Sequence, residues 1–167
     1  QSGRTAGDCV VWGRYRGAGL KELGATIGMV AETGIWGDSA EAAAVQNMAE
    51  SGYVAIAHGI QPAGQRGGQG RLDATQDLFA NGVLLAVRSG YPGGWDNVAR
   101  DTDGRGLAAC ITTADGVTLR VAGVYGVSGS SLPSFAANPG KVAAEERLLK
   151  FVRSQVELAM KNAWVLV

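Results

Sequence analysis

Short apolar runs separated by glycine-rich turns recur along the chain and predict β-strands. The runs at residues 27–31, 53–57 and 83–87 have the length and the bounding glycines of buried strands. Further strands are predicted at residues 8–12, 108–113, 118–125 and 164–167. Because Asp115-Gly116 is a hairpin turn, we expect residues 83–87, 108–113 and 118–125 to form an antiparallel meander.

A helical spacing of apolar residues predicts two helices. The first begins at Asp38, which can act as its N-cap, and Glu41 three residues later completes a pattern like a capping box. This helix ends near Glu50. The second covers about residues 142–162 and carries one continuous apolar face. Residues 61–70 contain glycines, one arginine and no large apolar side chain, which predicts a long loop.

Composition indicates one globular domain over residues 1–167, with 46% hydrophobic residues. Fifteen basic and fifteen acidic residues cancel, which argues against a strongly basic nucleic-acid-binding module. We see no signal peptide and no apolar run long enough to span a membrane. Since the chain lacks an initiating Met and ends in an apolar strand, we expect it to be processed or trimmed, or to be part of a longer chain, and to stop within a domain.

Glu32 is the first candidate functional residue, because it directly follows a buried strand. Ligands of α/β sheets bind at strand ends, and one carboxylate can hold Mg²⁺ together with water and phosphate. The alternative is that Glu32 faces solvent without a ligand. Arg14 lies in an Arg-Tyr-Arg cluster beside glycines, and its guanidinium group could bind phosphate there. The alternative is that the cluster belongs to an ordinary solvated loop.

Other residues that often carry chemistry give weaker signals. His58, the single histidine, has no partner visible in the sequence, which favours a structural or exposed residue and gives no basis for a Ser-His-Asp triad. Cys9 and Cys110 lie in apolar runs and predict buried free thiols. Asp101 and Asp103 begin like a calcium loop, but the later acidic ligands are absent.

Taken in order, these elements resemble the N-terminal portion of the endonuclease/exonuclease/phosphatase (DNase I-like) superfamily, and look closest to retroelement endonuclease domains. Ala31-Glu32-Thr33 is similar to the family's Gln-Glu-Thr. Asp103-Gly-Arg-Gly-Leu107 is similar to its Gly-Arg segment. Val124-Tyr125-Gly126 is similar to its Asn-x-Tyr-x-Pro.

The resemblance implies a fold and a hydrolytic site. The fold is α/β, part of a four-layer α/β/β/α sandwich that is truncated before the second sheet is complete. The resemblance implies that Glu32 binds the catalytic Mg²⁺, that Tyr125 reaches the scissile phosphate, and that Arg105 contacts phosphate. The expected substrate is DNA or another phosphodiester.

Departures from the family pattern limit the expected activity. Gly13, Ala31 and Val127 replace the usual Asn, Gln and Pro. The family's water-activating Asp and general-base His would follow Val167, so we expect a partial, inactive endonuclease domain. One alternative is a non-catalytic structural subunit whose open sheet face is covered by protein partners. Another is a phosphate- or nucleic-acid-binding remnant, which the zero net charge disfavours.

Overall fold

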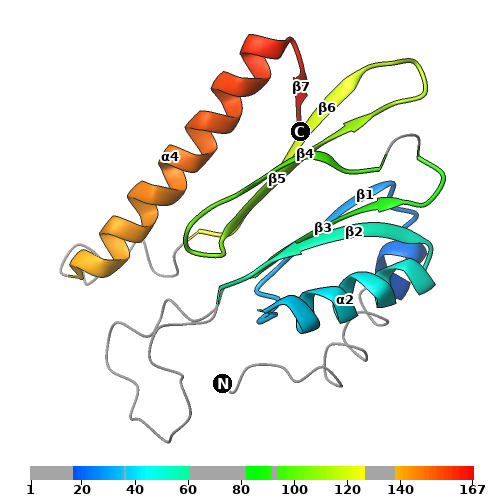
Figure 1. Cartoon of the computed structure of the whole chain (residues 1–167), viewed down its shortest axis with the longest axis horizontal. Helices are drawn as coiled ribbons and strands as arrows, with labels where there is room; N and C mark the ends of the chain where they lie inside the picture. Colours follow the sequence, from blue (N-terminus) through cyan, green and yellow to red (C-terminus); the bar gives the residue numbers. More distant parts are fainter. Residues whose placement is uncertain (1–16, 36, 61–81, 92–93, 127–137) are drawn as a thin grey trace, which may run out of the picture.

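A computed structural model describes residues 17–35, 37–60, 82–91, 94–126 and 138–167 as a mixed α/β structure with two sheets (Figure 1). The first sheet contains β1 (Ile27–Ala31), β2 (Tyr53–His58) and β3 (Val83–Arg88), with β3 in the centre. The second contains β4 (Asp96–Arg100), β5 (Gly106–Thr112), β6 (Thr118–Val124) and β7 (Val165–Leu166), in that order. Among the described residues, the helical segments are residues 17–22, α2 (Asp38–Glu50) and α4 (Pro139–Asn162).

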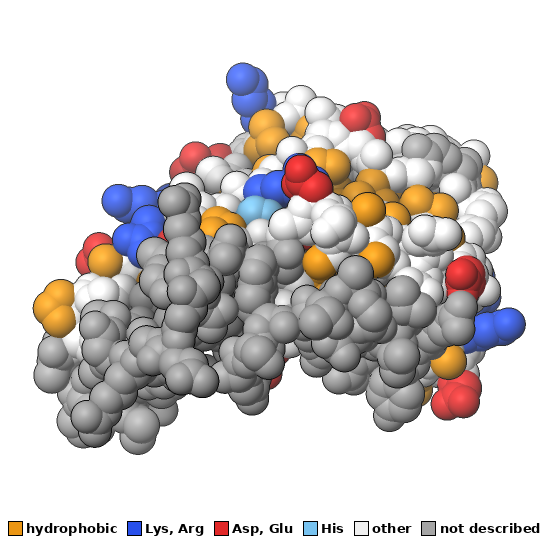
Figure 2. Space-filling view, turned by 60° about the horizontal axis from the view of Figure 1, so that its bottom comes forward, with side chains coloured by type: hydrophobic (Ala, Val, Ile, Leu, Met, Phe, Trp, Pro, Cys, Tyr) orange, Lys and Arg blue, Asp and Glu red, His pale blue; other side chains and the backbone are white. Residues whose placement is uncertain are grey.

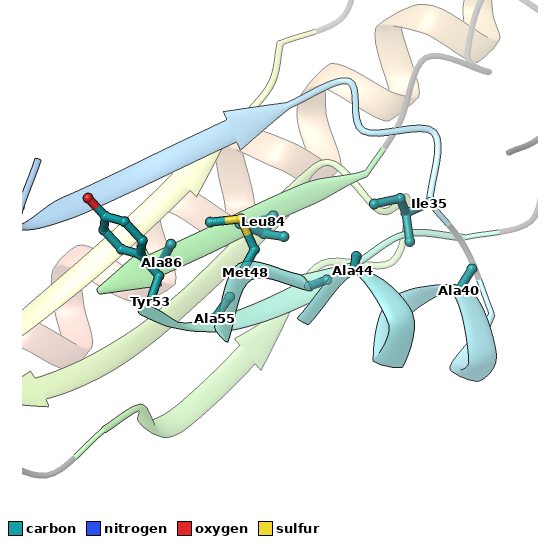
Figure 3. Packing of buried hydrophobic residues seen from close by; sticks show 9 residues of the cluster. Ile35, Ala40, Ala44, Met48, Tyr53, Ala55, Leu84 and Ala86 are labelled. Atoms are coloured by element: carbon teal, nitrogen blue, oxygen red, sulfur yellow. The ribbon is translucent and has the colours of Figure 1, made fainter. Parts of the chain in front are cut away.

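Strand β3 is apolar from Val83 to Val87 because both of its faces are covered there. Every residue from 83 to 87 is at most 1% exposed. Leu84 and Ala86 face α2, where they pack with Ala44 and Met48 of that helix (Figure 3). Leu85 and its neighbours on the opposite face share a core with β5 and β6. The first sheet is therefore packed between α2 and the second sheet.

Helix α4 covers the second sheet (Figure 1). It begins at Pro139, a few residues before the predicted start, because Asn138 accepts a hydrogen bond from Lys141 N and proline suits a first helical position. Its Gln155 accepts a hydrogen bond from Arg120 of β6, and both side chains are buried. A Cβ at Gly106 would meet the Phe151 ring at 2.7 Å, so glycine lets β5 approach the helix closely.

The predicted cap of α2 is wrong. The N-cap residue is Gly37, and no side chain caps the helix. Glu41 instead accepts a hydrogen bond from the backbone N–H of Gly59 at 3.0 Å, because the chain leaving β2 passes the start of α2. Asp38 lies in the first turn, where a negative charge still favours the helix dipole.

The predicted three-stranded meander is also wrong in one pairing. The β5–β6 hairpin is confirmed, but β3 pairs antiparallel with β1 and β2 in the other sheet. The place beside β5 is taken by β4, whose mostly exposed and polar residues gave no strand signal. The terminal strand is confirmed as β7, which pairs parallel with β6.

The remaining expectations divide between described and undescribed residues. Cys110 is a buried free thiol, as predicted. Arg14, Cys9, the strand at 8–12 and the loop at 61–70 lie outside the described residues. Across the residues that the structure describes, no helix combines the length and apolar character of a membrane span.

Candidate functional site

One end of the two sheets brings together the residues that the sequence singled out. The ends of β1, β2 and β6 meet the starts of β3 and β5 there. The backbone N–H of Thr33 donates to Gly82 O at 3.1 Å, and that of Gly82 donates to Gly104 O at 2.7 Å. These bonds tie the loop after β1 to the loop before β5. In Figure 2, acidic, basic and histidine side chains lie close together beside hydrophobic ones.

Glu32 and Tyr125 are in contact at this end. The Tyr125 hydroxyl donates a hydrogen bond to the Glu32 carboxylate across 93 residues of sequence. Glu32 is exposed and has a positive φ of 54°, which is uncommon for a residue other than glycine. The turn after β1 therefore directs this carboxylate toward the end of β6.

Arg105 lies behind Tyr125 at the start of β5. Its side chain is buried, and its guanidinium carbon is 5.3 Å from the centre of the Tyr125 ring. Nη1 donates to Gly126 O at 3.0 Å, whereas Nη2 is buried without a hydrogen-bond partner. Burial lowers the pKa of Arg105, and its electrostatic interactions with Tyr125, Asp103, Asp101 and Glu145 partly offset that effect.

His58 has a partner that the sequence did not reveal. Its Nε2 lies 2.9 Å from the main-chain oxygen of Asp101 and 3.7 Å from Asp101 Oδ1. The same Oδ1 accepts hydrogen bonds from the backbone N–H groups of Arg105 and Gly106, both at 2.8 Å. Burial raises the pKa of Asp101, but the bonds from His58, Gly106 and Arg105 outweigh it and leave the pKa lowered.

Together these residues form a series of contacts that begins at β2 of the first sheet, passes through the second sheet and returns to the end of β1: His58, Asp101, Arg105, Tyr125 and Glu32. We call this series the site contacts. Outside it, Arg147 of α4 makes a 2.8 Å ion pair with Asp103, and both side chains are partly exposed. The predicted residues Glu32, Tyr125 and Arg105 therefore lie together, and His58 and Asp101 extend the group.

The possible metal ligands are few. Within the described ranges, no three His, Cys, Asp or Glu side chains gather as a metal cluster. Glu32 is a single exposed carboxylate next to a hydroxyl group. That donor set suits Mg²⁺, which binds one or two protein carboxylates and keeps water and phosphate as its other ligands.

Comparison with known proteins gives no family assignment. No protein-family model matches the chain, and neither a curated protein nor a solved structure shows significant similarity to it. Any function therefore has to be argued from the site itself.

Proposed function

We propose that the site contacts belong to a Mg²⁺- and phosphodiester-binding site of an endonuclease-like domain. In this proposal, α2, the two sheets and α4 are parts of a four-layer α/β/β/α sandwich. The observation that supports it is the contact between Glu32 and Tyr125, which the resemblance pairs at one phosphate. DNA or another phosphodiester is the proposed ligand.

Each residue has a distinct task in this proposal. Glu32 holds Mg²⁺, which when bound offsets negative charge on a phosphate oxygen. Tyr125 turns its hydroxyl from the carboxylate to that phosphate and donates a hydrogen bond to it. Among the described residues, His58 contacts the main-chain oxygen of Asp101 through Nε2, and we assign it a structural role. Because no described residue is assigned as general base in this proposal, we expect binding with little hydrolysis.

Metal binding by Glu32 is tested with Mn²⁺, a paramagnetic substitute for Mg²⁺, in an electron paramagnetic resonance titration. Glu32→Gln should weaken Mn²⁺ binding at least about tenfold, because it removes the one charged oxygen ligand. Glu157→Gln, an exposed change on α4, should leave it unchanged. Equal affinities in Glu32→Gln and the wild type would rule the proposal out. Mg²⁺-dependent nicking of plasmid DNA, if measurable, should disappear with Glu32→Ala.

A second candidate, a non-catalytic structural subunit, is favoured by the surface of β7. Val165 is 50% exposed, Leu166 43% and Val167 58%, and β7 pairs with one described strand. An apolar strand at a sheet edge is prone to pair with another chain. We expect the protein to associate in sedimentation velocity at tens of micromolar, and Leu166→Lys to shift it toward monomer. A monomer at all concentrations would argue against self-association through this edge.

A further inference from the structure

Arg105 is a buried cation that no described carboxylate pairs with. The carboxylate of the neighbouring Asp101 accepts a hydrogen bond from the backbone N–H of Arg105, not from its guanidinium group. The guanidinium keeps one hydrogen bond, to Gly126 O, and its contact with the Tyr125 ring. Burying a charge is costly, and arginine does not lose its proton at physiological pH. Asp101, Asp103 and Glu145 act on the guanidinium group through longer-range electrostatic attraction and form no ion pair with it among the described residues. The molecule thus carries a positive charge, 1% exposed beside Tyr125, whose Nη2 has no hydrogen-bond partner.

A second buried arginine shows that this arrangement is not general in the fold. Arg120 is also fully buried, but Nη1 donates to Asn97 O and Nη2 to Gln155 Oε1. Its guanidinium carbon lies 6.0 Å from the centre of the Trp164 ring, and only Nε lacks a partner. Arg120 joins β4, β6 and α4, so its hydrogen bonds are used within the fold. Arg105 instead leaves a whole amino group unpartnered at the candidate site.

We propose that Arg105 is an anion receptor that takes one phosphate group at the corner between Tyr125 and Gly126. This inference rests on the proposed function, because the phosphate belongs to the phosphodiester ligand. A phosphate oxygen supplies Nη2 with a charge-assisted hydrogen bond and offsets the guanidinium charge. Because Nη2 is buried, the Tyr125 ring must shift to let the anion reach it. The Tyr125 hydroxyl then donates its hydrogen bond to the phosphate instead of to Glu32.

Inorganic phosphate without metal is the direct probe. The melting temperature of the wild type should rise with added phosphate relative to sodium chloride of equal ionic strength, because binding stabilises the folded state. A ³¹P NMR titration should give the dissociation constant. Arg105→Met should raise that constant at least about tenfold. Without phosphate, Arg105→Met should be no less stable than the wild type, because it removes a buried unpaired charge.

Two control variants test whether the effect is specific to Arg105. Arg147→Gln, which removes a partly exposed cation near Asp103, should keep the wild-type response to phosphate. Arg120→Met should lower the melting temperature, yet should keep the phosphate-dependent rise. If Arg105→Met keeps the wild-type dissociation constant, or if phosphate affects the wild type no more than chloride does, the proposal is overturned.

Glu32→Gln separates this inference from the proposed metal site. Without metal, the Glu32 carboxylate competes with phosphate for the Tyr125 hydroxyl and repels it, so Glu32→Gln should strengthen phosphate binding. The same variant should weaken Mn²⁺ binding. Unchanged Mn²⁺ binding together with stronger phosphate binding would contradict the proposed metal site but still support the proposed anion receptor. Weaker phosphate binding in Glu32→Gln would place the anion elsewhere and overturn the inference.

Discussion

Asp101→Ala should lower the free energy of unfolding by about 4 kcal/mol, because two buried backbone hydrogen bonds and the contact with His58 end on this carboxylate. The backbone N–H groups of Arg105 and Gly106 both donate to Oδ1, and His58 lies beside it. Without the carboxylate, two buried N–H groups lose their partner. Urea unfolding followed by circular dichroism at pH 7 measures the effect.

Asp103→Ala is the matched control two residues away. It removes the ion pair with Arg147, whose side chain is 46% exposed, so the loss should be under about 1 kcal/mol. A similar cost for the two variants would show that the hydrogen bonds of Asp101 do not stabilise the turn before β5 as we infer.

The stability due to Asp101 should also depend on pH in a defined direction. Its pKa is lowered from the ordinary 3.8, so the folded protein binds this proton less readily than the unfolded chain. The contribution is complete above the ordinary value and is lost as the pH falls through the folded pKa. The stability difference between the wild type and Asp101→Ala should thus be constant from about pH 5 to 8 and shrink in more acid solution. A difference that shrinks on raising the pH would contradict this assignment.

Gly82→Ala should cost about 3 kcal/mol and should also disturb Glu32. Gly82 has a φ of 99°, a conformation that strains any side chain. A Cβ there would overlap Thr33 Oγ1 and lie 3.3 Å from Gly34 N. Thr33 is buried and its Oγ1 accepts a hydrogen bond from Ile35 N, so it cannot move aside easily. The turn that carries Glu32 must shift instead, and Mn²⁺ affinity should fall together with stability.

Gly90→Ala separates backbone strain from steric overlap. Gly90 has a similar φ of 90° but open space where its Cβ would lie. It should cost about 1 kcal/mol and leave Mn²⁺ binding unchanged. Equal losses of stability in Gly82→Ala and Gly90→Ala would mean that Thr33 is not held in place as described.

The sequence predicted most elements of the described fold but not all of their pairings. Apolar runs located β1, β2, β3, β5 and β6, and helical spacing located α2 and α4. Pairing failed for β3 because a strand that is apolar on both faces fits the centre of either sheet. Only the packing of α2 on one face and the second sheet on the other decides between them. Strand β4 was missed because an exposed edge strand needs no apolar pattern.

The candidate site was predictable only in part. Glu32 and Tyr125 were singled out at strand ends, and the structure brings them into contact. The partner of His58 could not be predicted, because Asp101 lies 43 residues away in a turn of the other sheet. Arg105 contacts Tyr125 and Gly126 at the end of β6, and no local pattern before β5 encodes those contacts.

The sheet-to-sheet course of the site contacts has a consequence for how the protein folds. Glu32 and Tyr125 meet across 93 residues, and closing such long loops is slow because of its entropy cost. The site should therefore be absent from any folding intermediate in which one sheet is formed and the other is not. Ligands that need both sheets will be recognised only by fully folded molecules, so they should slow unfolding without accelerating refolding.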